Sequence, residues 1–408
     1  MVQKKTRQPA AALVIGVLGL AYFLSNFHRL SLGVIGTDVA ASLDLTKAQL
    51  GALGSAYFYS YAIMQLPCGA LTDRFGSKPL VIASCLMMTI SSVWFALAES
   101  FVSLTLSRVM TGMATALVYI PSLCLLRETF GDKVYGSLTG IFVSIGHVGA
   151  ACAAYPLRFA ADLAGWRTTS LILGILPVGI AALVLFFIQW HRPVPAGGTA
   201  EPAQKEKSSW GQLLKPWCLA LTVWFFVAGG VRLSFQSLWG GQFFETALGK
   251  TPAQSSLLLM CVSLSGIVGP TVLGALSDRI GSVKTALAGS LVFMLCWPVM
   301  NLFTENASMV ALCVVMCIMG FSGVGSFTVG YSVVRSFADK RDTGKITGIN
   351  SFAAFISSAL FTQFTGQLMD GFGGTPLENF HLLFWIFAGL VLLSVLILGL
   401  GTRKKMNK

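Results

Sequence analysis

Two arginines stand inside long apolar stretches of the chain. Arg29 lies in SNFHRLSLGVIG, residues 25–36, and Arg232 begins RLSF in the second half of the chain, just as Arg29 begins RLSL. None of the sixteen Asp and Glu residues falls in the middle of an apolar stretch. A guanidinium in nonpolar surroundings needs a counter-charge, and its paired N–H donors match the oxygens of a carboxylate or phosphate. The two arginines therefore predict a binding site for a small organic anion.

Further polar side chains follow the two arginines at helical spacing. Tyr22, Asn26 and Arg29 are four and three residues apart, so they share one face of a helix. Gln236 follows Arg232 by four residues and shares a face with it in the same way. Such residues also serve helix packing and hydrogen bonding between helices, which is the alternative interpretation. We expect six polar residues to line the site with the arginines: Tyr22, Asn26, Tyr61, Gln65, His147 and Gln236.

The composition requires a hydrophobic environment. Of 408 residues, 55% are hydrophobic and only 11% are charged, whereas a soluble domain carries about 25% charged residues. Runs of about 20 apolar residues, long enough to cross the hydrocarbon core of a bilayer, recur along the chain. Twelve are present: 10–36, 46–71, 79–98, 101–126, 134–158, 167–190, 217–243, 253–276, 283–303, 308–334, 343–368 and 380–401. We predict an all-α membrane protein with twelve transmembrane helices in a lipid bilayer, the first being a retained helix rather than a signal peptide.

The net charge of +12 is distributed unevenly over the connections between these runs. Most Lys and Arg residues fall on one side of such a bundle, and only four fall on the other: Lys47, Arg158, Arg167 and Lys250. Connections rich in Lys and Arg stay on the cytoplasmic side of a membrane. We therefore predict cytoplasmic termini and a place in a bacterial inner membrane. The basic charge follows topology, so we expect no nucleic-acid partner.

The chain repeats itself on either side of a polar connection. GALTDRFGS at residues 69–77 returns as GALSDRIGS at 274–282, with seven identities in nine, and RLSL returns as RLSF. Repeats in the same order at nearly one spacing indicate two homologous halves, and transporters built in this way hold their site between the repeats. We predict two pseudo-symmetric six-helix bundles, at 1–190 and 216–408, joined by a cytoplasmic linker at 191–215 that is rich in Pro, Gly and charge.

The sequence resembles the major facilitator superfamily over its whole length. That family's loop between helices 2 and 3 reads Gly-x-Leu-x-Asp-Arg-x-Gly-x-Lys or Arg, and GALTDRFGSK matches it, with a second copy in the other half. The resemblance implies transport by alternating access. It also implies that Asp73 pairs with Arg127, and Asp278 with Arg335, to latch one conformation; a static charged cap is the alternative. We expect ten residues in this switch: Gly69, Asp73, Arg74, Gly76, Arg108, Arg127, Asp278, Arg279, Gly281 and Arg335.

Arg108 belongs to RVMTG, which is similar to the Arg-x3-Gly motif in the fourth helix of the superfamily. It is the third basic residue inside an apolar run. It lies nearer the outer face, where we expect Asp38 or Glu99 to reach it. A structural ion pair and a role in transport both remain open for this residue.

Within the superfamily, the sequence is most similar to the organophosphate:phosphate antiporters and to related organic-anion carriers, including anion:cation symporters. Those carriers place one arginine in helix 1, another in helix 7, a tyrosine in helix 2 and a histidine in helix 5, which resemble Arg29, Arg232, Tyr61 and His147. Four residues after the tyrosine the antiporters have a lysine, whereas this chain has Gln65. The departure favours a carboxylate over a phosphate ester.

These patterns predict a monomeric secondary transporter of a small organic anion, either a carboxylate or a phosphorylated metabolite. Two other functions stay open: efflux of drugs or cations, and sensing of a metabolite without transport. No catalytic set, nucleotide loop or metal cluster is present in the sequence, so we expect no enzyme activity, cofactor or metal. Because the acids lie in connections or at helix ends, we expect exchange for a counter-anion, or a proton carried by His147, rather than a buried carboxylate. Asp38 is the acid that comes nearest to this expected site in the sequence, nine residues beyond Arg29.

Overall fold

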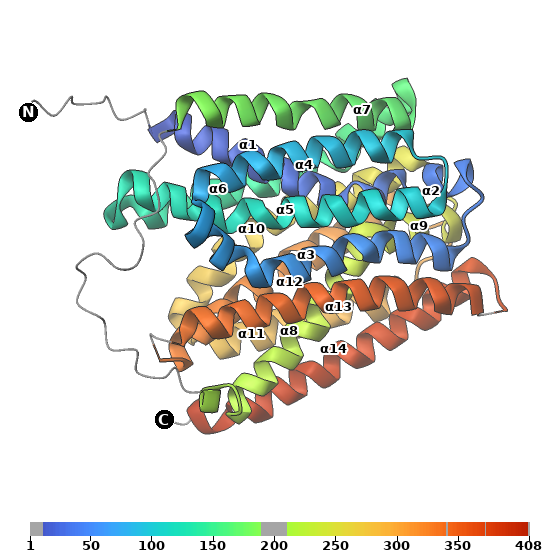
Figure 1. The fold of residues 1–408 in the computed structure, drawn as a ribbon. Coiled ribbons are helices and arrows are strands. Elements are labelled where there is room, and N and C mark those ends of the chain that lie inside the picture. Colours follow the sequence, from blue (N-terminus) through green and yellow to red (C-terminus); the bar gives the residue numbers. More distant parts are fainter. Residues whose placement is uncertain (1–10, 189–209, 340–341, 372, 407–408) are drawn as a thin grey trace, which may run out of the picture.

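The computed structural model describes residues 11–188, 210–339, 342–371 and 373–406, and these residues form helices and no strands (Figure 1). In chain order, the elements are α1 (Ala11–Leu30), α2 (Leu32–Ser42), α3 (Lys47–Phe75), α4 (Ser77–Leu97), α5 (Phe101–Phe130), α6 (Asp132–Cys152), α7 (Tyr155–Phe187), η1 (Trp210–Gln212), α8 (Pro216–Ser234), η2 (Phe235–Trp239), α9 (Gly240–Gln242), η3 (Phe243–Ala247), α10 (Pro252–Ile280), α11 (Ser282–Met300), α12 (Met309–Phe337), α13 (Thr343–Gly371) and α14 (Pro376–Met406). The predicted linker lies largely outside the described residues.

These elements combine into the twelve crossing segments that the apolar runs predict. The first segment is α1 continued by α2, and the seventh is α8 continued by η2, α9 and η3. A kink at Gly165, whose φ of 78° suits glycine, divides α7 between the fifth and sixth segments. Nine of the described helices are individually long and apolar enough to cross a membrane. The fold class predicted from the sequence is confirmed.

The repeat in the sequence is also a repeat in the structure. Helices α3 and α10 each have 29 residues, and each begins with a capping box, at Thr46 and Thr251 respectively. Each ends at a glycine with positive φ, 88° at Gly76 and 95° at Gly281, a conformation that other residues rarely adopt. Gly76 and Gly281 therefore have the same structural role in the two predicted switch motifs: each ends one helix and allows the chain to turn into the next.

The two halves meet along a seam that is tightest at one end of the bundle. We call the end where α1 begins and α14 ends the terminal face, on the left in Figure 1, and the other end the far face. Near the far face, a Cβ on Gly51 would lie 2.9 Å from the carbonyl oxygen of Thr362, and one on Gly241 would lie 2.0 Å from that of Gly33. Glycine at these positions lets backbones of opposite halves touch.

A carboxylate of one half also caps a helix of the other half at the far face. The Asp370 carboxylate accepts hydrogen bonds from the backbone N–H groups of Lys47 (3.2 Å) and Ala48 (2.8 Å), at the first turn of α3. A negative charge at a helix N-terminus is favourable because the N–H groups there have no partner within the helix. Further toward the middle of the bundle, Tyr59 donates to Gln363 at 2.9 Å. The far face is therefore closed.

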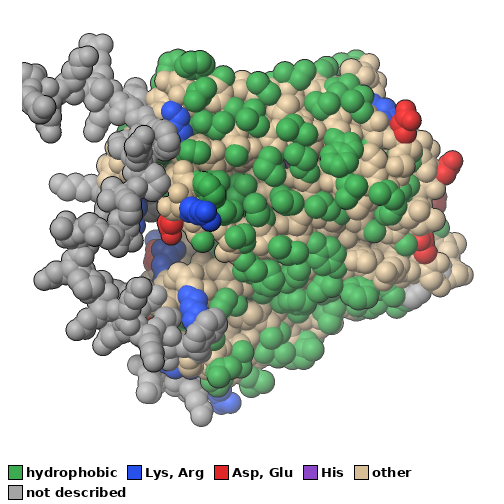
Figure 2. Space-filling model, viewed as in Figure 1, with side chains coloured by type: hydrophobic (Ala, Val, Ile, Leu, Met, Phe, Trp, Pro, Cys, Tyr) green, Lys and Arg blue, Asp and Glu red, His purple; other side chains and the backbone are tan. Residues whose placement is uncertain are grey.

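The surface shows a broad apolar band between two charged ends (Figure 2). In this view Lys and Arg side chains gather at the terminal face, where the molecule is hollowed between the two halves, and the acidic side chains lie mostly at the far face. The exposed apolar side chains belong to helices throughout the chain, such as Phe186 of α7 and Leu400 of α14. An apolar belt of this kind is the surface that a bilayer covers.

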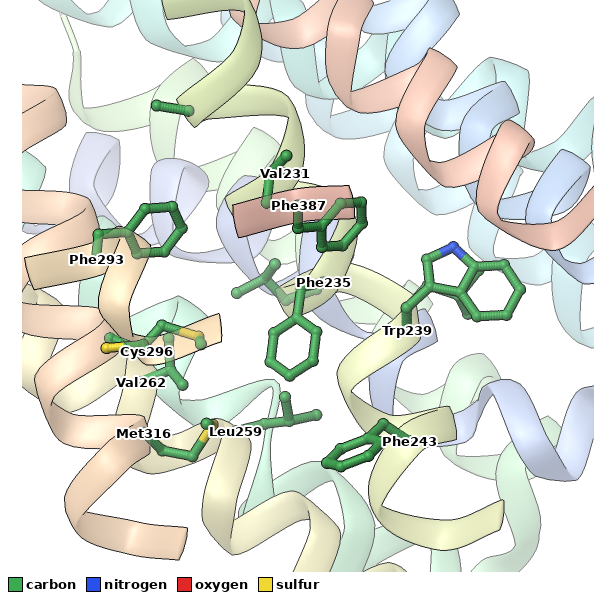
Figure 3. Close-up of a cluster of buried hydrophobic side chains, with 14 of the residues drawn as sticks. Val231, Phe235, Trp239, Phe243, Leu259, Val262, Phe293, Cys296, Met316 and Phe387 are labelled. Atoms are coloured by element: carbon green, nitrogen blue, oxygen red, sulfur yellow. The ribbon is translucent and has the colours of Figure 1, made fainter. Parts of the chain in front are cut away.

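A cluster of buried aromatic side chains fixes the seventh segment (Figure 3). Phe235 packs edge-on against Trp297, with ring centroids 5.2 Å apart, and lies 6.1 Å from Phe384 of α14. Val231 points into the same cluster from the previous turn. Because these residues anchor one face of the segment, the neighbouring residues Arg232 and Gln236 occupy another face.

Candidate functional site

Arg29 lies at the end of α1, two residues before the break between α1 and α2. One Nη atom donates to Asn26 Oδ1 and the other to Tyr61 Oη, both at 3.2 Å. The guanidinium carbon lies 5.1 Å from the ring centroids of both Tyr61 and Phe355. Phe355 belongs to α13 of the opposite half. Among the described residues, Arg29 is therefore held by neutral groups, with an aromatic ring of each half beside it, which is a cation–π arrangement.

Arg232 takes the corresponding position at the end of α8. Its Nη1 lies 3.5 Å from Gln236 Oε1, and its guanidinium carbon lies 5.2 Å from the ring centroid of Phe327. Gln236 Nε2 donates to Ser263 Oγ at 3.1 Å, which ties this face to α10. The next element, η2, is a π-helix, a form that is often found at functional sites.

His147 joins this site from α6. The charges of Arg232 and Arg29 both act on its imidazole, and the charge of Arg29 acts on Arg232, so the three side chains lie close together. All three are half-buried, and each belongs to a membrane-crossing segment. Helix α6 approaches α1 closely: a Cβ on Gly146 would lie 2.2 Å from the Tyr22 ring. The structure thus brings together three residues that are far apart in the sequence.

The remaining predicted site residues surround Arg29. Tyr61 is buried, and Gln65, one turn further along α3, lies within hydrogen-bonding reach of it. Asn26 Nδ2 donates to the carbonyl of Tyr22 at 3.0 Å. The Tyr22 ring stacks on Phe142 at 4.7 Å, so this tyrosine also packs the first bundle.

The site is electropositive because no acid among the described residues forms an ion pair with its arginines. Among the described residues, the ion pairs involve neither Arg29 nor Arg232, and their hydrogen bonds go to neutral oxygens. The Nε atom of each arginine is buried without a hydrogen-bond partner. Asp38, the acid nearest to Arg29 in the sequence, pairs instead with Arg158 at 2.5 Å. Two guanidinium groups with unused donors in a low-dielectric region have the chemistry to bind an anion.

The expectation that Asp38 or Glu99 pairs with Arg108 is wrong. Arg108 is buried, its Nη1 donates to the carbonyl of His28 at 3.1 Å, and its guanidinium carbon lies 4.9 Å from the Tyr57 ring centroid. Asp38 is taken by Arg158, and the described ion pairs do not include Glu99. The side chain of Arg108 therefore points into the first bundle, toward α1, rather than toward the acids of the far face.

All the predicted switch residues except Arg108 lie at or near the terminal ends of α3, α5, α10 and α12. Asp73 and Arg127 both act electrostatically on Cys124, so they lie in the same corner of the first half. Ser77 Oγ donates to Glu128 Oε1 at 3.1 Å and joins the start of α4 to the end of α5. In the second half, Asp278 and Arg335 are exposed, and the described residues show no ion pair between them. A Cβ on Gly69 or Gly281 would meet open space, and Gly76 and Gly281 both have positive φ at the helix ends.

Three aromatic residues near the arginines were not predicted from the sequence. Phe327 and Phe355 cover the arginines, and Tyr331 contacts Phe327 at 5.6 Å between ring centroids. Tyr331 Oη lies 3.0 Å from Ser351 Oγ and interacts with the charge of Arg232. For Phe355, the internal repeat could have indicated a place at the site. It stands 208 residues after His147, the same offset that relates Arg127 to Arg335.

Comparison with known proteins identifies the family. The model of the Major Facilitator Superfamily matches residues 18–240 and again residues 226–407. The chain belongs to this superfamily. Two solved structures share the fold: a bacterial homologue of the human lysosomal transporter Spinster in an inward-facing, occupied conformation (TM-score 0.75, 18% identity, 96% of both chains), and the nucleoside transporter NupG (TM-score 0.76, 13% identity, 95% of this chain and 99% of that one).

The curated relatives of this superfamily member include carriers named for organic acids. A probable sulfoacetate transporter, SauU, of Cupriavidus necator is 27% identical over 71% of this chain and 73% of its own. A D-galactonate transporter of Escherichia coli is 22% identical over 89% of this chain and 90% of its own. A hexuronate transporter of Bacillus subtilis is 23% identical over 88% of both chains. The family is one of membrane transporters and not of enzymes, which confirms that prediction.

Proposed function

We propose that this protein is a secondary transporter that moves a small organic anion across the membrane by alternating access, with Arg29 and Arg232 binding the anion. The observation that carries the proposal is the pair of half-buried guanidinium groups, one from each half, that act on each other without a described acid between them. A cation would meet two positive charges there, which argues against the efflux of cations. An anion between the arginines relieves their repulsion and uses their unpaired donors.

A carboxylate is the substrate class that fits the site best. The groups around the arginines are neutral hydrogen-bonding side chains, Tyr61, Gln65, Asn26 and Gln236, and these suit hydroxyl or carboxyl oxygens. The relatives are named as a probable sulfoacetate transporter, a D-galactonate transporter and a hexuronate transporter, and each of these molecules has an acidic group. Gln65 offers hydrogen bonds but no charge. A doubly charged phosphate ester would therefore meet one positive charge fewer here than in a carrier with lysine at this position.

Alternating access follows from where the two halves touch. The far face is closed by backbone contacts at Gly51 and Gly241 and by the cap from Asp370, whereas the terminal face is hollowed between the halves (Figure 2). We interpret this arrangement as the state that is open to the terminal side. The corner formed by Asp73, Arg127 and their counterparts then closes the terminal side when the far face opens.

Orientation and coupling belong to the same proposal. The Lys and Arg side chains at the terminal face support a cytoplasmic terminal face in a bacterial inner membrane, with both termini inside. One chain contains both halves, 1–190 and 216–408, and each half supplies one arginine of the proposed site. We therefore expect a monomer to be sufficient for transport. The driving force is exchange for a counter-anion or a proton that is carried by His147, a side chain on which the charges of both arginines act.

Uptake by the purified protein in proteoliposomes tests the proposal. A thermal-shift screen of small carboxylates, sulfonates, sugar acids and phosphates first selects ligands, because a ligand that binds only the folded state stabilises it. Radiolabelled ligands are then offered to vesicles that contain wild-type protein, Arg29→Ala or the control variant Arg403→Ala, which removes an exposed charge at the end of α14. We expect saturable uptake that is lost only in Arg29→Ala. Ligand binding without any uptake would support a sensor instead.

A further inference from the structure

A small cavity lies within the first half of the molecule rather than between the halves. It has a volume of about 30 Å³, and the residues that line it come from α1, α2, α4, α5 and α7 together with Ser31 between α1 and α2. A space of this size holds one guest about as large as a water molecule or a monatomic ion. It is too small for a sugar acid or another organic anion. The two halves can also move against each other without taking this cavity apart.

Two buried basic side chains line the cavity, and each has a nitrogen atom without a partner. Arg108 of α5 is only 4% exposed, and His28 of α1 is 8% exposed. Among the described residues, neither Arg108 Nε nor His28 Nε2 has a hydrogen-bond partner. Arg108 Nη1 donates to the backbone carbonyl of His28 at 3.1 Å, so the two residues are tied together. The guanidinium and a neutral imidazole with its proton on Nε2 both offer N–H donors.

The charge of Arg108 has no counter-charge in the ion pairs of the described residues. Its neighbours are neutral: the carbonyl of His28 and the ring of Tyr57, whose centroid lies 4.9 Å from the guanidinium carbon. A buried charge is costly unless it is paired or well hydrogen-bonded. An anion in the cavity would supply the missing counter-charge at the guanidinium.

The other groups in the wall also favour an anion over a water molecule. The hydroxyl groups of Thr111 and Ser170 donate to carbonyls of their own helices, at 2.8 and 2.7 Å. The carbonyl of His28 already accepts from Arg108 and from Ser31 Oγ. A water molecule could accept from the free N–H groups, but it would not neutralise the guanidinium. The remaining wall is largely apolar and suits a weakly hydrated halide ion; it includes Phe27, Ile35, Phe95, Leu157 and Leu173.

We propose that this cavity binds one halide ion, with chloride as the natural ligand, held by Arg108 and His28. Both residues belong to the first half, so the ion is a resident ligand and not the transported substrate. Because His28 directly precedes Arg29, the bound ion also stabilises the end of α1 from which Arg29 projects. This site is separate from the proposed site between the halves, and the inference does not depend on the transported anion.

Thermal unfolding of the purified full-length protein tests the site without a substrate. Sodium chloride or sodium bromide is titrated at constant ionic strength against sodium methanesulfonate, whose anion is too large for the cavity. A ligand that binds only the folded state raises the unfolding temperature with a saturable dependence on its concentration. We expect this rise in wild-type protein and also in Arg29→Ala, because Arg29 belongs to the proposed substrate site. No saturable rise in the wild type would overturn the proposal.

Variants of the two basic residues locate the ion. His28→Leu removes one donor and keeps an apolar side chain, so the apparent Kd for chloride should rise about tenfold or more, the usual effect of losing a hydrogen bond to a charged group. Arg108→Met should abolish the response; if it does not fold, His28→Leu still decides. His381→Leu, the same substitution at a half-buried histidine of α14, is the control and should respond as the wild type does. Equal chloride affinity in wild-type protein and His28→Leu would refute the site.

The two anion sites can be told apart by their responses. A chloride response that is lost in Arg29→Ala but kept in His28→Leu would place the halide between the halves. It would overturn this inference and leave the proposed function intact. Crystals grown in sodium bromide add a direct observation, because bromide scatters anomalously. We expect an anomalous peak beside Arg108 and His28, and density for a water molecule alone at that place would contradict the proposal. Absence of transport would count against the proposed function only.

Discussion

His147 and Phe355 occupy equivalent positions of the two halves, 208 residues apart, and each faces the arginine of the other half. The Phe355 ring lies 5.1 Å from the guanidinium carbon of Arg29, whereas the His147 imidazole interacts most strongly with Arg232. The pseudo-symmetry therefore places two matched arginines in unlike surroundings. One has an apolar ring and the other a hydrogen-bonding ring. We therefore expect the proposed site to distinguish the two ends of an asymmetric anion.

The first prediction concerns this asymmetry. Phe355→Leu keeps an apolar side chain but removes the ring that covers Arg29, and a cation–π contact is worth about 0.5–1 kcal/mol or more when desolvated. We expect a loss of substrate affinity of about two- to fivefold in binding to the purified protein, with folding intact. Phe364→Leu, an exposed aromatic residue of the same helix, is the control. Equal affinity in all three proteins would show that the Phe355 ring does not act on the site.

The second prediction concerns the arginines themselves. Removing one partner of a desolvated charge pair costs about 2–5 kcal/mol, so Arg29→Ala and Arg232→Ala should each reduce the rate of uptake by more than about thirtyfold. The Lys variants should recover little, because an ammonium group lacks the paired, planar donors of a guanidinium. Uptake in proteoliposomes and thermal unfolding of the same samples separate transport from stability. Near-normal uptake in both Ala variants would refute the two-arginine site.

Much of this site could be predicted because the arginines and their polar neighbours share helical faces. The Arg29–Asn26 hydrogen bond follows from a spacing of three residues, and the approach of Gln236 to Arg232 follows from a spacing of four. The internal repeat also pairs the two arginines, because RLSL and RLSF stand at matching places in the two halves. The twelve crossing segments follow from the apolar runs for a similar reason, since a bilayer demands a nearly fixed length of apolar helix.

The contacts between halves could not be predicted, because they depend on helices that are distant in the chain. Phe355 reaches Arg29 only after α13 packs on α3, and no local pattern reports that packing. The failure at Arg108 has a related cause. A single straight helix over 10–36 gives no reason for the carbonyl of His28 to be available, whereas the structure breaks the helix at Ser31 and Arg108 donates to that carbonyl.

The third prediction concerns the charge preference of the substrate. Gln65 lies within reach of Tyr61, next to Arg29, so Gln65→Lys adds a positive charge to the site. We expect the ratio of affinities for dianions and monoanions to rise, as measured by competition with matched pairs such as a sugar acid with one carboxylate and the corresponding diacid. Gln65→Met, of similar length and without charge, should leave that ratio unchanged. An identical profile in the Lys variant would exclude Gln65 from the binding surface.

The fourth prediction concerns the closed far face. Asp370 caps the first turn of α3 across the seam, and loss of a capping side chain typically costs about 1 kcal/mol. Asp370→Ala should therefore shift the protein about fivefold toward the state with an open far face, and amide exchange at residues 47–50 should increase accordingly. Asp44→Asn, in the connection before α3, is the control, because it removes a nearby exposed charge and keeps a residue that tolerates the positive φ at this position. No change in exchange at the start of α3 would show that the cap does not hold the halves together.

The last prediction concerns coupling. Asp38 is paired with Arg158, and the described residues show no ion pair between an acid and Arg29 or Arg232. The proposed binding site therefore offers no carboxylate among these pairs that could carry the proton. We expect uptake either to depend on an internal counter-anion or to be driven by a pH gradient through His147. Uptake with and without an imposed pH gradient, measured for wild-type protein, His147→Gln, His147→Ala and Asp38→Asn, separates these routes. If the gradient drives uptake, the His147 variants should lose that response while retaining exchange of bound anions, because the arginines are intact. Gradient-driven uptake that survives both His147 substitutions but disappears in Asp38→Asn would place the proton on the far-face carboxylates instead.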